Sequence, residues 1–247
     1  MKKLSGWLLG SAAALTMSQV MAAEGAHWGY EGEAAPEHWG ELAPEFASCS
    51  LGKNQSPVNI TGEVKAAVPK LTFSYTSQAT EVLNNGHTIQ ANFAPGSWVK
   101  LGGHAYELKQ AHFHAPSENE IHGKAFPMEG HLVHQDKNGQ LAVVAVMFVP
   151  GKAQSAIARI WDQMPETAGE KHEFSGKLSA AELLPKNHAY YYFSGSLTTP
   201  PCSEGVSWIV LKSPVQAEKA QFEHFSHTMH HPNNRPVQSL NARVVIN

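Results

Sequence analysis

Short runs of alternating apolar and polar residues fill much of the sequence after its N-terminal region. Successive side chains of a strand point to opposite faces of a sheet, so this alternation predicts half-buried strands. Four such runs, separated by clusters of glycine, asparagine and proline, occupy residues 71–75, 88–93, 98–101 and 106–108. We therefore expect a β-sheet that packs one face on a core.

A hairpin is predicted farther along the chain. Residues 131–134 and 141–148 are largely apolar and flank Asn138-Gly139. An Asn-Gly pair between two apolar runs is a strong signal for a tight turn, so the two runs should pair antiparallel. The second run is apolar without interruption, which indicates a central strand buried on both faces.

Helical patterns are fewer and shorter than strand patterns. They cover residues 155–164, where Pro165 should end the helix, residues 179–184 and residues 217–227. Residues 27–53 are rich in glycine, proline and tryptophan, and predict loops and short turns. With no linker, repeat or low-complexity tract, the chain is expected to form one mainly β domain.

Composition excludes several classes of protein. The 247 residues are 42% hydrophobic and 16% charged with a net charge of −3, and the basic residues are scattered. This is the composition of a folded globular protein with no basic surface for nucleic acid. The unusual feature is the count of 15 histidines, because histidine is the commonest metal ligand and titrates near neutral pH.

The first residues have the features of a secretory signal. Lys2 and Lys3 precede an apolar stretch at 4–17 and small residues near Ala22. We expect residues 1–22 to be a signal peptide, with Ala23 as an alternative cut, and residues 23–247 to be the exported domain. An uncleaved membrane anchor is the alternative, but the apolar stretch is short for a bilayer.

The two cysteines, Cys49 and Cys202, are the only thiols of the chain. An even pair without C-x-x-C spacing in an exported protein favours a structural disulfide over a redox centre. The alternative is two buried free thiols.

Candidate chemistry is densest on two predicted strands. Gln110, His112 and His114 alternate along one run, and Glu129 and His131 alternate along another, so each set shares a face. If the strands are neighbours, three histidines converge, and three imidazoles with an open fourth position are typical of catalytic zinc. Gln110 and Glu129 each precede a histidine by two residues and could orient its ring. A solvent-facing polar row is the alternative.

Two further segments carry polar groups. Residues 195–202 form a loop in which two prolines follow the hydroxyls of Thr198 and Thr199, although the segment could be only a rigid turn. His87 follows the turn residues Asn84-Asn85-Gly86 and would stand at the end of the next strand, where an ordinary surface histidine is the alternative.

Together these segments resemble the α-class carbonic anhydrases. The resemblance extends from His27 to Pro236, and it is carried in order by residues 55–60, 84–87, 110–114, 117–119, 129–134 and 196–201. The cysteine pair, the leader and the short connection at 126–129 resemble the exported bacterial members in particular. The resemblance implies a single domain on a large, mostly antiparallel twisted sheet of about ten strands. It also implies short peripheral helices, a conical zinc cleft and a periplasmic location.

The resemblance also implies a reaction and a ligand set. It assigns Zn²⁺ to His112, His114 and His131, and the orienting roles to Gln110 and Glu129. The reaction is reversible hydration of carbon dioxide to bicarbonate and a proton, by attack of zinc-bound hydroxide. Thr198 is expected to accept a hydrogen bond from this hydroxide while it donates one to Glu118.

The remaining site residues follow from the same resemblance. His87 is the expected proton shuttle, and sulfonamides and anions are the expected inhibitors; a homodimer is plausible. The substrate pocket and polar path are expected at Val133, Val143, Leu197, Thr199, Val206 and Trp208, and at Tyr30, Asn85 and Gln90. Asn119 departs from the family pattern, since many members have histidine there.

Two other classes of protein remain open at this point. A periplasmic copper–zinc superoxide dismutase also carries an HxH motif and a disulfide, and a zinc-buffering surface protein would use the histidine excess without catalysis. His224, His227 and His231 would share a helix face. They predict either a second metal site or, as we prefer, a polar helix end.

Overall fold

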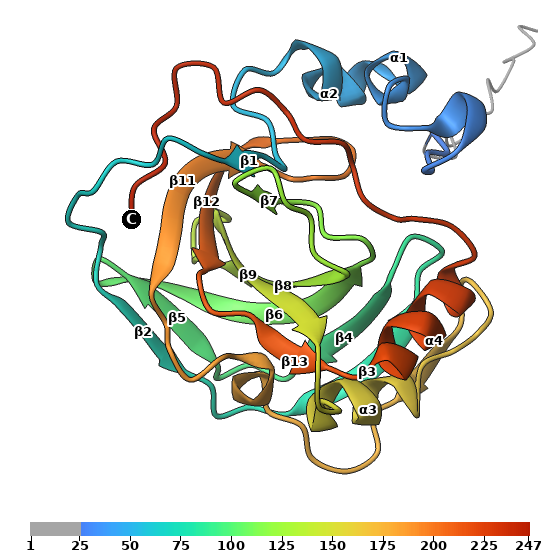
Figure 1. Cartoon of the computed structure of the whole chain (residues 1–247). Coiled ribbons are helices and arrows are strands. Elements are labelled where there is room, and N and C mark those ends of the chain that lie inside the picture. Colours follow the sequence, from blue (N-terminus) through green and yellow to red (C-terminus); the bar gives the residue numbers. More distant parts are fainter. Residues whose placement is uncertain (1–25) are drawn as a thin grey trace, which may run out of the picture.

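The computed structural model describes residues 26–247, so the predicted signal peptide at 1–22 and its boundary lie outside the described residues. The fold is mainly β, with one large curved sheet of eleven strands and a few short helices around it (Figure 1). The predicted fold class is confirmed, with eleven strands where about ten were expected.

The strands of the large sheet run in a mixed order along the chain. Their bounds are β2 Leu71–Ser74, β3 Ala79–Asn84, β4 Ile89–Phe93, β5 Trp98–Leu101, β6 His104–His114, β8 Met128–Gln135, β9 Leu141–Pro150, β10 Lys171–Glu173, β11 Tyr190–Ser196, β12 Glu204–Leu211 and β13 Val215–Ala217. A separate parallel pair joins β1 (Asn59–Ile60) to β7 (Glu120–Ile121).

The order across the sheet is β10-β3-β4-β6-β8-β9-β12-β11, with β5 also pairing β6, β2 pairing β5, and β13 pairing β9. Strand β9 is parallel to β12 and β13, and the other pairs of this sheet are antiparallel. This order places β6 and β8 side by side near the middle of the sheet, which is where the predicted histidine strands need to be.

The predicted hairpin is present, and β9 is buried on both faces as its apolar run indicates. Strands β8 and β9 pair antiparallel, and Gly139 in the turn has φ +85°, which a residue without Cβ adopts readily. Val144 and Phe148 pack into one core, and Val143 and Met147 into a second core on the opposite face. The sheet thus separates a helix-covered core from the face that carries the histidines.

Helices α3 (Ser155–Trp161) and α4 (Lys219–Met229) cover the first core (Figure 1). The first ends three residues before the predicted limit. The second begins two residues late because Ala217 belongs to β13 and Glu218 caps the helix in a capping box with Gln221. Predicted segment 179–184 is a 3₁₀ turn, η3 (Ala180–Leu183).

The N-terminal part of the described chain is a series of short helical turns, in line with the prediction. These are η1 (Gly32–Ala34), α1 (Trp39–Leu42), η2 (Pro44–Phe46) and α2 (Ser48–Leu51). The predicted disulfide joins Cys49 in α2 to Cys202 in the loop after β11, and both cysteines pack with the buried Trp39. The bridge attaches this region to the loop that carries Thr198.

Between residues 26 and 247, no helix combines the length and the apolar character needed to cross a membrane.

Candidate metal centre

The register between β6 and β8 brings the three predicted ligands together. His112 lies directly opposite His131, and His114 follows two residues later on the same face of β6. Their ring centroids are 4.7 to 5.2 Å apart. One ring nitrogen from each histidine lies within 4.8 Å of the others, which is close enough for one metal ion to bind all three.

A hydrogen bond at the opposite nitrogen orients each of these rings. His112 Nδ1 donates to Gln110 Oε1 (2.8 Å), and His131 Nε2 donates to Glu129 Oε1 (2.9 Å). His114 Nδ1 donates to the backbone carbonyl of Asn233 (2.6 Å). Each acceptor fixes the tautomer, so the unprotonated nitrogen of each ring faces the shared space.

Burial keeps the three imidazoles neutral. It lowers the pKa of each ring, and the neighbouring histidines lower the values of His112 and His131 further. His114 Nε2 is buried without a hydrogen-bond partner among the described residues. Neutral imidazoles with a nitrogen left free are what a zinc ion requires, so the residues fit the metal that the resemblance implies.

Glu129 is the centre of a buried hydrogen-bond network behind the ligands. Besides His131, its carboxylate accepts from the backbone N–H groups of Glu118 (2.8 Å) and Asn119 (2.7 Å), and from the Asn119 side chain (2.7 Å). Burial raises the pKa of Glu129 to about 7, and the N–H donors oppose this rise. Asn119, the departure from the family pattern, is thus part of the support for His131.

Glu118 and Thr198 lie beside the ligands. The backbone N–H of Arg235 donates to Glu118 Oε1 (2.9 Å), while Oε2 lies 3.5 Å from His114 Nε2. Burial raises the pKa of Glu118 well above its ordinary value, and Arg235 and the Thr198 hydroxyl favour the ionised form. Glu118 Oε2 itself meets no partner in full hydrogen-bond geometry within the described residues.

The predicted apolar pocket residues form one cluster next to His131. Val143, Val206 and Trp208 are buried, Val133 and Leu197 pack against them, and the Trp208 ring is 5.0 Å from that of His131. The structure therefore places an apolar wall beside the histidine cluster.

The predicted polar residues line a cleft of about 120 Å³ that leads to the histidines. Its walls contain Tyr30, Asn85, His87, Gln90, Gln110, His112, His114 and Thr199, together with Trp28 and Thr88, which were not predicted. The His87 ring stacks on Trp28 at 3.7 Å. Asn85 Oδ1 accepts from the backbone N–H groups of His87 and Thr88, so it also shapes the turn.

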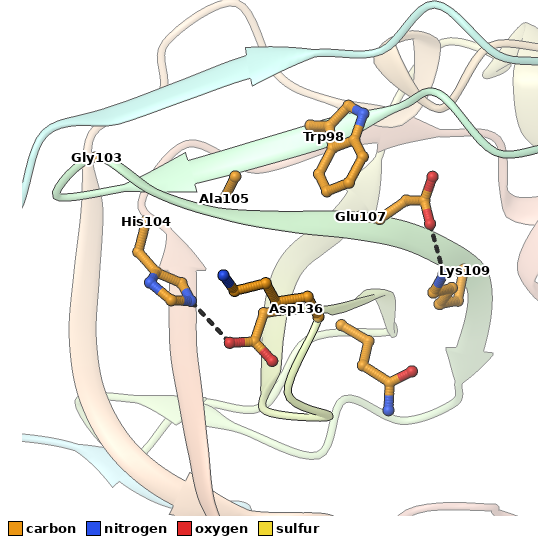
Figure 2. Close-up of a pocket in the computed structure, with 9 residues that line it drawn as sticks. Trp98, Gly103, His104, Ala105, Glu107, Lys109 and Asp136 are labelled. Atoms are coloured by element: carbon orange, nitrogen blue, oxygen red, sulfur yellow. Dashed lines mark hydrogen bonds and ion pairs between the residues drawn. The ribbon is translucent and has the colours of Figure 1, made fainter.

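The cavity drawn in Figure 2 is larger, about 500 Å³, and lies at the other end of β6. Four of its charged or titratable side chains are already paired with one another, His104 with Asp136 and Lys109 with Glu107. No free histidine nitrogens converge among the residues that line it, so the smaller cleft is the candidate site.

Besides Trp28 and Thr88, sequence reasoning missed two residues that support the site. Asn233 holds His114 through a backbone carbonyl, which carries no sequence signal, and its side chain donates to the carbonyl of His87 (3.0 Å). Arg235 is buried and reaches Cys49 O, Gln55 Oε1 and Ser56 O. The available sequence signal was the Asn-Asn-Arg-Pro segment at 233–236, where the resemblance ends.

Within the described residues, the large sheet carries three neutral, individually oriented histidines with no fourth protein ligand in the cluster, an arrangement typical of catalytic rather than structural zinc sites. Comparison with known proteins identifies the family. Residues 34–247 match the family described as eukaryotic-type carbonic anhydrase. The chain belongs to this family, also called the α-class, and it is a carbonic anhydrase.

Individual relatives agree with the family. The chain is 48% identical to a carbonic anhydrase of Pectobacterium carotovorum over 91% of its length and 92% of the relative, and 52% identical to one of Neisseria gonorrhoeae over 89% and 87%. An α-carbonic anhydrase of Thermovibrio ammonificans, solved with the inhibitor sulfanilamide, superposes with a TM-score of 0.89 at 49% identity, covering 90% of this chain and all of that one. The family and the relatives' names support hydration of carbon dioxide.

Proposed function

We propose that the chain catalyses the reversible hydration of carbon dioxide to bicarbonate and a proton, with Zn²⁺ held by His112, His114 and His131. The observation that carries this is the convergence of three ring nitrogens, each opposite a nitrogen tied to an acceptor. Zinc at such a site supplies hydroxide at neutral pH, because it lowers the pKa of water to about 7, a value established with carbonic anhydrases themselves.

Thr198 and Glu118 orient the nucleophile in this proposal. An ionised Glu118 accepts a hydrogen bond from the Thr198 hydroxyl, which leaves the threonine oxygen only as an acceptor toward the attacking group. Support comes from the position of Thr198 beside the Glu118 carboxyl, which is fixed by Arg235 N–H. The orientation aims a lone pair at the substrate carbon.

The apolar cluster provides the place for carbon dioxide. The molecule carries no net charge and few hydrogen-bonding demands, so a wall of Val143, Val206 and Trp208 with Val133 and Leu197 suits it. Thr199 and Gln90 form the polar side of the cleft. The two walls separate the substrate from the route of the proton.

His87 is the proposed proton shuttle, with Tyr30 and Asn85 along the path from the metal centre. All three line the same cleft as His112. Imidazole titrates near neutral pH and can therefore both take up and release a proton during each turnover.

The proposals on inhibition and location rest on a relative and on the disulfide. The sulfanilamide complex of the Thermovibrio relative supports inhibition of this chain by sulfonamides and other anions. The Cys49–Cys202 disulfide fits export to the oxidising periplasm. A homodimer stays a prediction, which the mass of the protein in solution will test.

Metal analysis combined with a carbon dioxide hydration assay tests the main proposal. We expect one zinc per chain and fast hydration that stops when a chelator removes the metal. A zinc-loaded protein without hydration activity would contradict the proposal in favour of a zinc-buffering protein, and bound copper with superoxide turnover would favour a dismutase.

The shuttle has its own test in the His87→Ala variant. In weak buffer we expect turnover to fall about tenfold and to recover when imidazole is added, because a free base replaces the missing side chain. The ratio kcat/KM should stay unchanged, since substrate conversion does not use His87. An unchanged kcat in weak buffer would remove His87 from this role.

A further inference from the structure

Two further imidazoles, His27 and His231, lie close enough to His87 for their charge to act on it, although only His87 belongs to the proposed path. His87 lines the cleft and is half-buried. His231 lies against Tyr30, another residue of the cleft wall, with ring centroids 5.9 Å apart. His27 is exposed and lies near enough for its charge to act on His87.

The position of His231 differs from that of the other late histidines. His224, His227 and His230 are exposed at the end of α4, whereas His231 is half-buried just after it. The chain turns at His230, which adopts the left-handed conformation (φ +64°) and ends the helix. After this turn His231 lies between the helix end, where it shares a surface hollow with Ser226 and His230, and Tyr30 of the cleft wall.

Asn233 holds this segment against the shuttle residue. Asn233 lies two residues after His231, and the Asn233 side chain donates to the backbone carbonyls of His87 (3.0 Å) and Phe113 (2.9 Å). Its own backbone carbonyl accepts from His114. The buried Asn233 side chain therefore holds the backbone two residues after His231 against the backbone of His87.

The tautomer of His231 leaves one nitrogen available. Its Nδ1 donates to the carbonyl of Pro232 (2.9 Å), so Nε2 is the unprotonated nitrogen that can accept a proton. His87, by contrast, has one face of its ring covered by Trp28. Because the N–H bonds of an imidazole lie in the plane of the ring, this stacking does not block proton transfer through water at the edge of the His87 ring.

We propose that His231 is a second proton-transfer residue, which takes the proton from His87 through water and passes it to buffer in solution. The inference rests on the proposed function of His87. In the first step, the imidazolium of His87 gives its proton to neutral His231 and becomes neutral. The imidazolium of His231 then gives the same proton to a buffer base, so both rings are restored for the next turnover.

Electrostatics between the rings supports a stepwise transfer. Burial lowers the pKa of His87, and positive charge on His27 and on His231 lowers it further. A proton on His231 thus disfavours a second proton on His87, so protons pass one at a time. Among the described residues, His231 contacts the uncharged Tyr30 ring, shares a surface hollow with Ser226 and His230, and lies close enough to His87 for its charge to act there.

The test is a double-mutant cycle of His87→Ala and His231→Ala, measured by carbon dioxide hydration in weak and in strong buffer. His227→Ala is the matched control, an exposed histidine one helical turn away. In weak buffer we expect His231→Ala alone to lower kcat about two- to threefold, with kcat/KM unchanged and recovery in strong imidazole buffer. In the His87→Ala background the same change should have no effect, because the path is already broken.

Other results would overturn the proposal in distinct ways. An unchanged kcat of His231→Ala in weak buffer removes the residue from the path, and so does an equal loss in both backgrounds. A loss that strong buffer does not restore indicates a structural role. If His87→Ala itself has no effect, the shuttle fails and this inference fails with it, while zinc content and strong-buffer activity still report on the proposed function.

Discussion

The two ends of strand β6 carry two polar clusters that differ in one respect. At its beginning, in the cavity of Figure 2, His104 pairs with Asp136 at 2.9 Å and Lys109 pairs with Glu107 at 2.6 Å. At its other end, His112 and His114 each use one nitrogen for a hydrogen bond and leave the other free. The cavity is the larger of the two spaces, about 500 Å³ against about 120 Å³.

The difference shows that unsatisfied atoms mark this site better than volume does. A buried nitrogen without a partner costs free energy, and His114 Nε2 is such an atom. A metal ion removes this cost, whereas the paired groups of the cavity gain little from a ligand. The comparison leads to three predictions, in order of decreasing effect.

The largest effect is expected when one of the free nitrogens is removed. His112→Asn takes a ligand from the cluster, so zinc should be lost and hydration should fall by about three orders of magnitude. Zinc analysis and a hydration assay provide the measurement. His104→Asn, at the other end of the same strand, is the matched control and should leave both unchanged. Equal losses in the two variants would break the comparison.

A smaller effect is expected from a residue that orients a ligand without binding the metal itself. Glu129→Gln places an amide N–H₂ among the N–H donors of Glu118 and Asn119, so His131 loses its fixed orientation. We expect zinc affinity to fall about 10- to 100-fold, measured by competition with a chelator. Glu107→Gln is the control because its partner is a surface lysine. An unchanged affinity in Glu129→Gln would mean that this network does not support the metal.

The smallest effect concerns a histidine with both nitrogens tied. His134 is buried, accepts from the Tyr75 hydroxyl (2.7 Å) and donates to the carbonyl of Ala142 (3.3 Å). Burial lowers the pKa of His134 to about 3, below the ordinary value of about 6.5. The folded protein therefore favours the neutral His134 ring. The contribution of this ring to the free energy of unfolding is complete above pH 6.5 and declines as the pH falls toward 3.

The His134→Gln variant isolates that contribution. Between pH 6.5 and 4.5, the free energy of unfolding of the wild type should fall more steeply than that of the variant, by up to about 1.4 kcal/mol per pH unit. Denaturant titrations at several pH values measure the two slopes, and the difference cancels the other titrating groups. Parallel slopes would show that protonation of His134 does not lower the free energy of unfolding.

Local patterns predicted the parts of the site that lie within single strands. Alternation placed Gln110 with His112 and Glu129 with His131, because the period of a strand is two. The apolar run of β9 correctly indicated burial on both faces. The cysteine pair was predictable because the chain contains only these two.

Long-range geometry was not contained in such patterns. The register that sets His112 opposite His131 depends on a bulge near Lys109, and the pairing of Glu118 with Thr198 came only from the resemblance. Strands β3, β11 and β12 were missed, since their mixed burial follows from packing on both sides of the sheet. His134 carried no signal of its own burial because its surroundings form only in the folded sheet.

The role of Asn233 has a consequence for the order of events during synthesis. The three histidines leave the ribosome more than 100 residues before Asn233. Until Asn233 emerges, His114 lacks the carbonyl that fixes its tautomer. The nascent chain at that stage therefore contains every ligand but no finished site, and we expect the metal to be loaded only after Asn233 has been made.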